Sequence, residues 1–280
     1  MKKPAPRGKI EFEMNLSLTK HSSTLTGAPH IVLVHGMGSA ATAWKPLTPF
    51  LQERFNVITV DLPGHGKTPM IAGQAMDPIS IGELVVREVK EQLGVTEFDV
   101  IGNSWGGWIA LEMAASFPNS VRSVTALAPA GFWLATYVQR APGASQFRLL
   151  ASRSAALAPS FLKYERTRKI GFGDVSPRWR EFSYELCLDA TQAMAKSEGY
   201  FPAWDGMLHK RFDSPIDSNI PVKIIFGDSD KTLPATTCQE RTMAPQHSEW
   251  IIFEECGHAP MWDNTEKVAA HVMEIAGVSR

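Results

Sequence analysis

Short runs of apolar and β-branched residues recur along the chain, separated by longer segments of helical character. The runs are typical of strands buried on both faces of a sheet, and they cover residues 31–34, 57–60, 98–101, 121–127, 222–226 and 250–253. The helical segments between or after them cover residues 42–54, 80–93, 104–117, 235–243 and 264–276. This alternation predicts a mostly parallel sheet covered by helices on both faces. Alternating residues 10–18 predict an additional antiparallel edge strand.

The alternation of strands and helices is interrupted once, between Ala130 and Ile220. This interval contains helical patterns but no convincing strand pattern. Helices are expected there at residues 145–158, 160–170, 177–196 and 202–212. Residues 131–216 hold 12 Lys or Arg against 8 Asp or Glu, a balance of +4, so the rest of the chain, whose total is -1, carries -5. We therefore predict one domain, an α/β core of residues 1–130 and 217–280 with a helical insertion at residues 131–216.

Charge, hydropathy and cysteine content limit the partners and the compartment. A net charge of -1 leaves no basic stripe for a phosphate backbone, so no nucleic-acid partner is expected. No apolar run approaches the ~20 residues that span a bilayer, and the basic start leads into the alternating residues rather than a signal core. Three widely spaced cysteines, Cys187, Cys238 and Cys256, favour a reducing compartment. We expect a cytoplasmic protein.

The segment Gly102-Asn103-Ser104-Trp105-Gly106 lies directly after an expected strand and directly before an expected helix. This is the nucleophile-elbow pattern, in which two glycines allow a sharp turn that presents a strained serine at the carboxyl edge of the sheet. The helix that starts there would add free N–H groups suited to an oxyanion. The alternative is an ordinary helix start with a capping serine. The pattern alone is weak, because chance produces it in roughly one chain in ten of this length.

Three further loops follow expected strands. In His35-Gly36-Met37-Gly38, a glycine turn would aim the N–H of Met37 at the same point as the N–H of Trp105, which predicts an oxyanion hole. Residues 226–234 offer Asp228 and Asp230, either of which would orient a histidine, and residues 255–260 offer His258 as a general base. The order Ser, Asp, His on successive strand ends is that of an α/β-hydrolase triad.

These motifs, together with Asp61-Leu62-Pro63-Gly64-His65-Gly66, resemble the α/β-hydrolase fold family in its capped form. The resemblance extends from residue 35 to residue 260, and the insertion matches it in position and helical character. It implies a catalytic triad of Ser104, Asp230 and His258, with Asp230 rather than Asp228 as the acid, an oxyanion hole from the N–H groups of Met37 and Trp105, and no metal or organic cofactor. The insertion would then be a cap over the site.

Several neighbouring residues have simpler interpretations. We expect His35 and His65 to be structural, Asp61 to form a turn, and Cys256 to be a small buried residue rather than a nucleophile. Tryptophans Trp105, Trp108 and Trp262 are expected in the core rather than in the pocket.

We predict a serine hydrolase that cleaves a small carboxylic ester or lactone through an acyl-enzyme, with an apolar or aromatic group in the substrate. The aromatic residues of the insertion, 14 of the 26 in the chain, favour an apolar pocket, although they would equally bury the cap on the core. A carbon–carbon bond hydrolase of ring-fission diones is the nearest alternative, which Gly102-Asn103-Ser104 and Trp262, four residues after His258, also resemble. Ser104 at the elbow disfavours epoxide hydrolases and haloalkane dehalogenases, which use an aspartate there. A ligand receptor on a hydrolase scaffold is the alternative from another class. Oligomeric state stays open.

Overall fold

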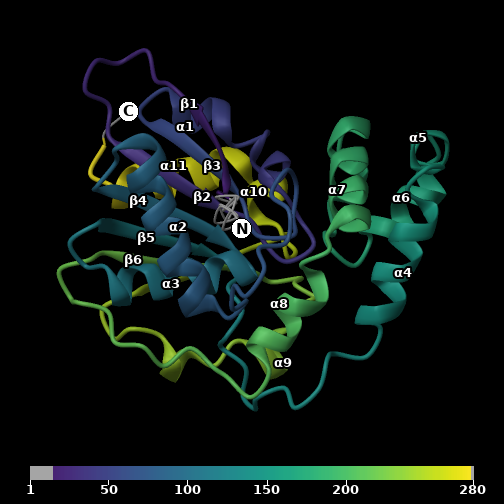
Figure 1. Ribbon diagram of the computed structural model, residues 1–280. Helices are drawn as coiled ribbons and strands as arrows, with labels where there is room; N and C mark the ends of the chain where they lie inside the picture. Colours follow the sequence, from purple (N-terminus) through teal and green to yellow (C-terminus); the bar gives the residue numbers. More distant parts are fainter. Residues whose placement is uncertain (1–14, 279–280) are drawn as a thin grey trace, which may run out of the picture.

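A seven-stranded sheet forms the centre of the computed structural model, which describes residues 15–278 (Figure 1). The strand order is β1-β3-β2-β4-β5-β6-β7. The strands are β1 (Ser17–His21), β2 (His30–Val34), β3 (Asn56–Asp61), β4 (Phe98–Asn103), β5 (Val121–Leu127), β6 (Val222–Gly227) and β7 (Glu249–Phe253). Strand β1 runs antiparallel to β3, and every other pair is parallel. The predicted mostly parallel sheet with an antiparallel edge strand is confirmed.

Successive strand residues point to opposite faces of the sheet, and each face has its own apolar cluster. Val32 and Val34 of β2 pack with residues of α2 (Pro78–Leu93) and α3 (Trp105–Ser116). Ile31 and Leu33, one position out of phase, pack on the other face with residues of α1 (Thr48–Gln52) and α11 (Thr265–Ile275). Helix α10 (Pro260–Asp263) directly precedes α11. Because both faces are covered, the strands read as continuous apolar runs in the sequence.

Two predicted helices of the core are shorter than their apolar patterns indicate. Residues 42–54 form a 3-10 turn, η1 (Ala41–Trp44), and the short helix α1, because Pro46 and Pro49 have no N–H to donate to the helical ladder. Residues 235–243 form α9 (Ala235–Cys238) and a 3-10 turn, η3 (Arg241–Met243). The N–H of Glu240 there donates to the carbonyl oxygen of Phe132 at 2.8 Å instead of continuing a helix.

The edge strand lies further along the chain than predicted. It covers Ser17–His21 rather than residues 10–18, of which residues 10–14 lie outside the described range. Its antiparallel direction is as expected.

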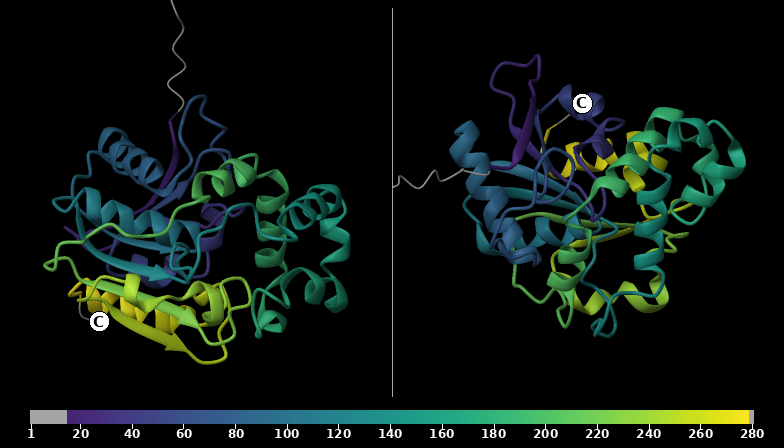
Figure 2. Two further views of the ribbon diagram at one scale, coloured as in Figure 1. Left: turned by 90° about the horizontal axis from the view of Figure 1, so that it is seen from below. Right: turned by 45° about the vertical axis from the view of Figure 1, so that its right-hand side comes forward.

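Between β5 and β6 the described chain contains helices and no strand, as predicted. They are α4 (Ala144–Ser154), α5 (Ala158–Phe161), α6 (Glu165–Phe172), η2 (Trp179–Glu181), α7 (Tyr184–Lys196) and α8 (Tyr200–Met207). Six buried residues form a separate apolar cluster here: Ala158, Leu162, Phe172, Trp179, Phe182 and Cys187. Figures 1 and 2 show α4, α5 and α6 at the outer edge of the molecule, with α7 between them and the sheet.

No helix within residues 15–278 combines the length and the apolar character that crossing a bilayer requires.

Candidate active site

Ser104 lies on a sharp turn between the end of β4 and the start of α3. Its backbone has φ 56° and ψ -120°, a strained conformation for a residue with a side chain. A Cβ atom on Gly102 would lie 2.0 Å from the carbonyl oxygen of Gly106, and one on Gly106 would lie 2.2 Å from the carbonyl oxygen of Val34. Neither position has room for a side chain, so the two glycines of the elbow pattern are required by close packing. The N–H of Ser104 donates to the carbonyl oxygen of Leu127 at 2.9 Å.

Asp230 and His258 meet at the carboxyl ends of β6 and β7. Nδ1 of His258 lies 2.9 Å from Oδ2 of Asp230, whose side chain is fully buried, and the N–H groups of Thr232 and Leu233 donate to Oδ1. Burial alone would raise the pKa of the Asp230 carboxyl, but the interactions with His258 and with these two N–H groups outweigh it and lower the pKa. The ionised carboxylate only accepts hydrogen bonds, so Nδ1 of His258 carries a proton and Nε2 faces away from Asp230.

The backbone of His258 is held next to the serine. Nδ2 of Asn103, the residue before Ser104, donates to the carbonyl oxygen of His258 at 3.0 Å and to that of Leu127 at 3.1 Å. Within the described residues, no hydrogen bond joins the hydroxyl of Ser104 to His258. The structure thus brings Asp230 and His258 into direct contact, and connects the backbone of His258 to Asn103, the neighbour of Ser104 in the chain.

The loop of residues 35–38 approaches Ser104 from the end of β2. A Cβ atom on Gly36 would lie 3.2 Å from Cβ of Ser104. The N–H of Met37, which follows, and the N–H of Trp105, at the start of α3, have no hydrogen-bond partner among residues 15–278. Both N–H groups are therefore free of hydrogen bonds within the described part of the chain, and the oxyanion hole stays a prediction.

Two buried histidines hold this loop. Nε2 of His35 accepts the N–H of Leu62 at 3.1 Å, and Nε2 of His65 accepts the N–H of Gly38 at 3.0 Å. Burial is the main cause that lowers the pKa of His35 to about 4 and that of His65 to about 3. Both rings are neutral at neutral pH, which fits the structural role expected for them.

Within residues 15–278, no hydrogen bond or ion pair joins the side chain of Asp228, Asp61 or Cys256 to His258. Asp228 accepts the N–H groups of Glu255 and Cys256, and so joins the two loops that follow β6 and β7. Asp61 accepts the N–H groups of Ala41 and Lys67, as expected of a turn residue. Burial raises the pKa of the Cys256 thiol to about 12, which leaves it protonated at neutral pH.

Trp105 and Trp108 are buried, and Nε1 of Trp108 donates to Glu112 at 2.8 Å, as expected of core residues. Trp262 is half-buried, and its Nε1 donates to the carbonyl oxygen of Ala43 at 2.8 Å. Among residues 15–278, no group of three or more His, Cys, Asp or Glu side chains is placed to hold a metal ion.

A second layer of contacts around His258 was missed from the sequence. The N–H of His258 donates to the carbonyl oxygen of Val175 at 2.8 Å, and the N–H of Gly257 donates to Oδ2 of Asp263 at 2.7 Å. Oδ1 of Asp263 accepts a hydrogen bond from the hydroxyl of Ser176. Burial raises the pKa of this carboxyl. Because Ser176 and Asp263 are 87 positions apart, only the folded chain reveals the contact.

The insertion also contacts the opposite side of the site. The N–H of Gly199 donates to the carbonyl oxygen of Gly64 at 3.0 Å. A Cβ atom on Gly38 would lie 2.4 Å from Cε of Met194 and 3.0 Å from Tyr200. The insertion therefore lies against both the loop of residues 35–38 and the loop that carries His258.

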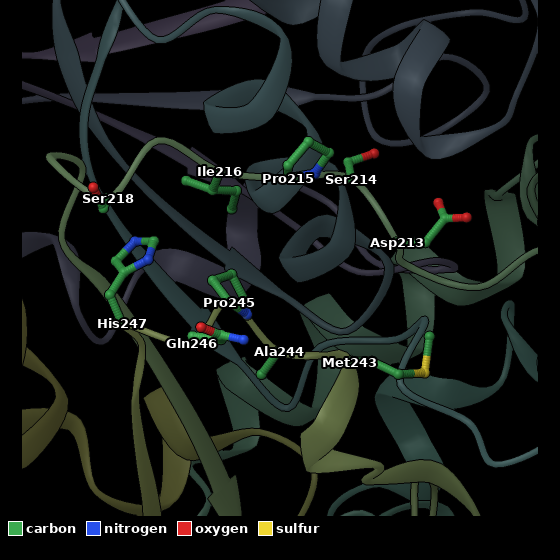
Figure 3. Close-up of a pocket in the computed structure, with 10 residues that line it drawn as sticks. All are labelled: Asp213, Ser214, Pro215, Ile216, Ser218, Met243, Ala244, Pro245, Gln246 and His247. Atoms are coloured by element: carbon green, nitrogen blue, oxygen red, sulfur yellow. The ribbon is translucent and has the colours of Figure 1, made fainter.

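A surface pocket of about 460 Å³ lies elsewhere, lined by residues 213–216, Ser218 and residues 243–247 (Figure 3). These segments precede β6 and β7, whereas Asp230 and His258 follow them. The pocket is therefore at the amino edge of the parallel strands, away from Ser104.

Comparisons with known proteins agree with this architecture. A model described as the alpha/beta hydrolase family matches residues 31–271. The monoacylglycerol lipase ABHD6 of Mus musculus is 24% identical and aligns over 88% of this chain and 75% of its own length. A 2-hydroxy-6-oxononadienedioate/2-hydroxy-6-oxononatrienedioate hydrolase of Paraburkholderia phymatum is 22% identical, over 92% of this chain and 90% of its own. The solved structure of a thermophilic esterase from Thermogutta terrifontis has a TM-score of 0.66 at 21% identity, with 92% of each chain covered.

Proposed function

The chain belongs to the alpha/beta hydrolase family, and on that premise we propose that it is a serine hydrolase which cleaves a small carboxylic ester or lactone through an acyl-enzyme. The observation that carries the proposal is the hydrogen bond between Asp230 and His258, at the sheet edge where Ser104 occupies a strained turn. A buried carboxylate, an imidazole and a presented hydroxyl at the ends of three strands are the parts that acyl transfer needs.

In the proposed mechanism, the hydroxyl oxygen of Ser104 attacks the carbonyl carbon while Nε2 of His258 takes its proton. Asp230 keeps Nδ1 protonated and stabilises the imidazolium. The N–H groups of Met37 and Trp105 bind the oxyanion of the tetrahedral intermediate. The imidazolium then protonates the leaving oxygen, and a water molecule activated by His258 releases the acid from Ser104.

The hydrogen bond between Ser104 and His258 is proposed to form when substrate binds. Catalytic hydrogen bonds are often long or absent without substrate. The bond from Asn103 to the carbonyl oxygen of His258 supports this step, because it fixes the backbone of His258 beside the elbow.

We also propose that residues 131–216 act as a cap that defines the substrate pocket. Met194 and Tyr200 support this role, since both lie against the loop of residues 35–38. An apolar lining from such residues would suit a substrate with an apolar or aromatic group. Three buried free cysteines are in keeping with a reducing, cytoplasmic location.

Carbon–carbon bond hydrolysis of a ring-fission dione is the second candidate. It is favoured by the Paraburkholderia relative, whose name describes that class of substrate and which aligns over 92% of this chain. The same triad would serve this reaction, so the choice depends on the pocket.

Fluorophosphonate labelling tests the nucleophile. We expect labelling of the wild type and of Ser218→Ala, an exposed serine at the opposite sheet edge, and none of Ser104→Ala. Labelling of Ser104→Ala would contradict the proposal. A folded wild type without labelling or turnover would instead favour a ligand receptor.

Parallel assays separate the two substrate classes. We expect p-nitrophenyl acetate or butyrate to be turned over faster than a ring-fission dione by the same preparation. A rate of dione turnover well above every rate of ester and lactone turnover would show that the protein is a carbon–carbon bond hydrolase.

A further inference from the structure

Exposed apolar side chains are concentrated on one part of the insertion. Of the eleven large hydrophobic residues that are exposed among those described, eight lie between residues 134 and 170. On and between α4, α5 and α6 they include Leu149, Leu157, Phe161, Tyr164 and Ile170, with Tyr164 67% and Ile170 76% exposed. Apolar side chains gathered in this way indicate a surface that is covered by something in the working state of a protein.

The same helices carry most of the positive charge of the insertion. Residues 144–172 contain six Lys or Arg and one acidic residue, Glu165, a balance of +5 in a chain whose total is -1. Glu165 is already paired with Arg180. Four exposed cations have no ion pair within residues 15–278: Arg153, Lys163, Arg166 and Lys169. We call these four cations and the five apolar residues above the α4–α6 surface.

Cationic and apolar side chains are exposed at neighbouring positions on these helices. Arg166, Lys169 and Ile170 of α6 stand at positions i, i+3 and i+4, and all three are exposed. Phe172 of the same helix is buried in the small cluster of the insertion. On α4, Leu149 and Arg153 are exposed at i and i+4. Figures 1 and 2 show these helices at the outer edge of the molecule, away from the sheet.

We propose that the α4–α6 surface docks onto an anionic lipid bilayer. Leucine, phenylalanine, tyrosine and isoleucine side chains would enter the boundary between headgroups and acyl chains, while the neighbouring lysines and arginines contact lipid phosphates. The apolar side chains would enter the bilayer only to a shallow depth, and the unpaired cations beside them complement the negative charge of the lipid headgroups. The attachment is peripheral.

The charge argues against a second copy of this chain as the occupant. In a symmetric dimer through this surface, each +5 segment would face its own copy. Like charges brought together in this way repel, whereas a surface of lipid phosphates neutralises them.

Vesicle flotation tests the proposal, with phosphatidylcholine vesicles compared with vesicles that also contain phosphatidylglycerol. We expect the wild type to bind the anionic vesicles at ~0.15 M salt, to lose most binding at ~1 M salt, and to bind phosphatidylcholine vesicles at least about tenfold more weakly. Removing two cations with R166Q/K169Q is expected to weaken binding roughly 30-fold. The matched control is K20Q/K90Q, which removes two exposed lysines of the core and is expected to bind as the wild type does.

The apolar contribution is tested separately with Tyr164→Ser/Ile170→Ser, for which we expect weaker binding that high salt reduces further. Both changes are at exposed positions, so an unchanged melting temperature verifies the fold. Ser104→Ala is expected to bind as the wild type does, which separates this result from the hydrolytic activity. Equal binding to both kinds of vesicle, no effect of R166Q/K169Q, or a stable dimer that does not bind vesicles would each overturn the proposal.

Discussion

The sheet core and the helical insertion are stabilised in different ways. The core buries apolar runs of strands β2 to β6 on both faces of the sheet, and residues such as Phe226 and Phe253 have no exposed surface. The insertion contributes residues such as Ala203 and Phe212 to the core cluster, buries six further residues in a cluster of its own, and leaves Tyr164 and Ile170 largely exposed. Its attachment near the site includes individual polar contacts, among them those of Val175 and Ser176 with the loop that carries His258. The side chains proposed for catalysis therefore lie on the core, and the insertion contacts the loop of His258 through a few hydrogen bonds.

The largest expected effect is the loss of catalytic rate when the proposed acid of the core is changed. Asp230→Asn should lower kcat roughly 10⁴-fold, because an amide does not keep His258 in the required tautomer or stabilise its charged form. Asp228→Asn is the matched control, since Asp228 accepts hydrogen bonds from Ser229, Glu255 and Cys256 and not from the His258 ring. Ester hydrolysis measured for both variants checks the assignment. Full activity in Asp230→Asn with loss in Asp228→Asn would reverse it.

The next contrast concerns the free energy of unfolding. Phe226→Ala removes a fully buried ring that stacks on Trp250, and we expect it to destabilise the protein by about 3–5 kcal/mol. Phe161→Ala, at a 46% exposed position of the insertion, should change the stability by less than about 0.5 kcal/mol. Urea unfolding measures both. Similar losses would mean that the insertion is packed as firmly as the core.

Acidic pH should lower the free energy of unfolding, because two buried histidines of the core resist protonation in the folded state. The folded-state pKa values of His35 and His65 are lowered to about 4 and about 3, so the unfolded chain takes up protons first as the pH falls below 6.5. The contribution of these two histidines to the free energy of unfolding is fully present above this pH and is lost progressively below it. Each ring should account for roughly 2 kcal/mol between pH 7 and pH 5.

His65→Gln, which keeps an acceptor for the N–H of Gly38, should therefore lose stability less steeply between pH 7 and pH 5. His209→Asn, at an exposed position, should retain the wild-type slope. Thermal unfolding followed across this pH range gives the comparison, and parallel curves for the wild type and His65→Gln would contradict it.

The smallest expected effect tests the link between the two regions. Asp263→Ala removes the acceptor of Gly257 and Ser176, and we expect kcat to fall roughly tenfold with little change in KM, because His258 is misplaced while the pocket is kept. Asp263→Asn, which retains an acceptor oxygen, should recover most of the rate.

Asp189→Ala is the control for that link, since its ion pair with Lys45 also joins the insertion to the core but lies away from His258. It should change kcat less than about threefold. Equal effects of Asp189→Ala and Asp263→Ala would mean that the whole insertion, rather than the bonds to the loop of His258, supports the rate.

The sequence was most informative where one local pattern decides the structure. The apolar runs predicted the six parallel strands because such strands are buried on both faces, and the glycines around Ser104 predicted the turn because no Cβ atom fits at Gly102 or Gly106. The sequence was misleading at residues 42–54, where the apolar pattern includes Pro46 and Pro49. These prolines interrupt the hydrogen bonds of a continuous helix.

Contacts between distant segments were not accessible to the same reasoning. Nothing around Ser176 or Asp263 indicates that the two side chains meet, since the contact depends on how the insertion returns to the sheet. The choice of Asp230 over Asp228 came from the family pattern, and the hydrogen bond to His258 supplies the physical reason for that preference. The catalytic roles stay predictions.

The backbone of Ser104 has a consequence for how this chain can evolve. A side chain held at φ 56° and ψ -120° costs about 1–3 kcal/mol that glycine would not. Selection for stability alone would therefore favour glycine at position 104. Under the proposed function, Ser104 marks a trade-off in which folding stability is given up for a hydroxyl at the edge of the sheet.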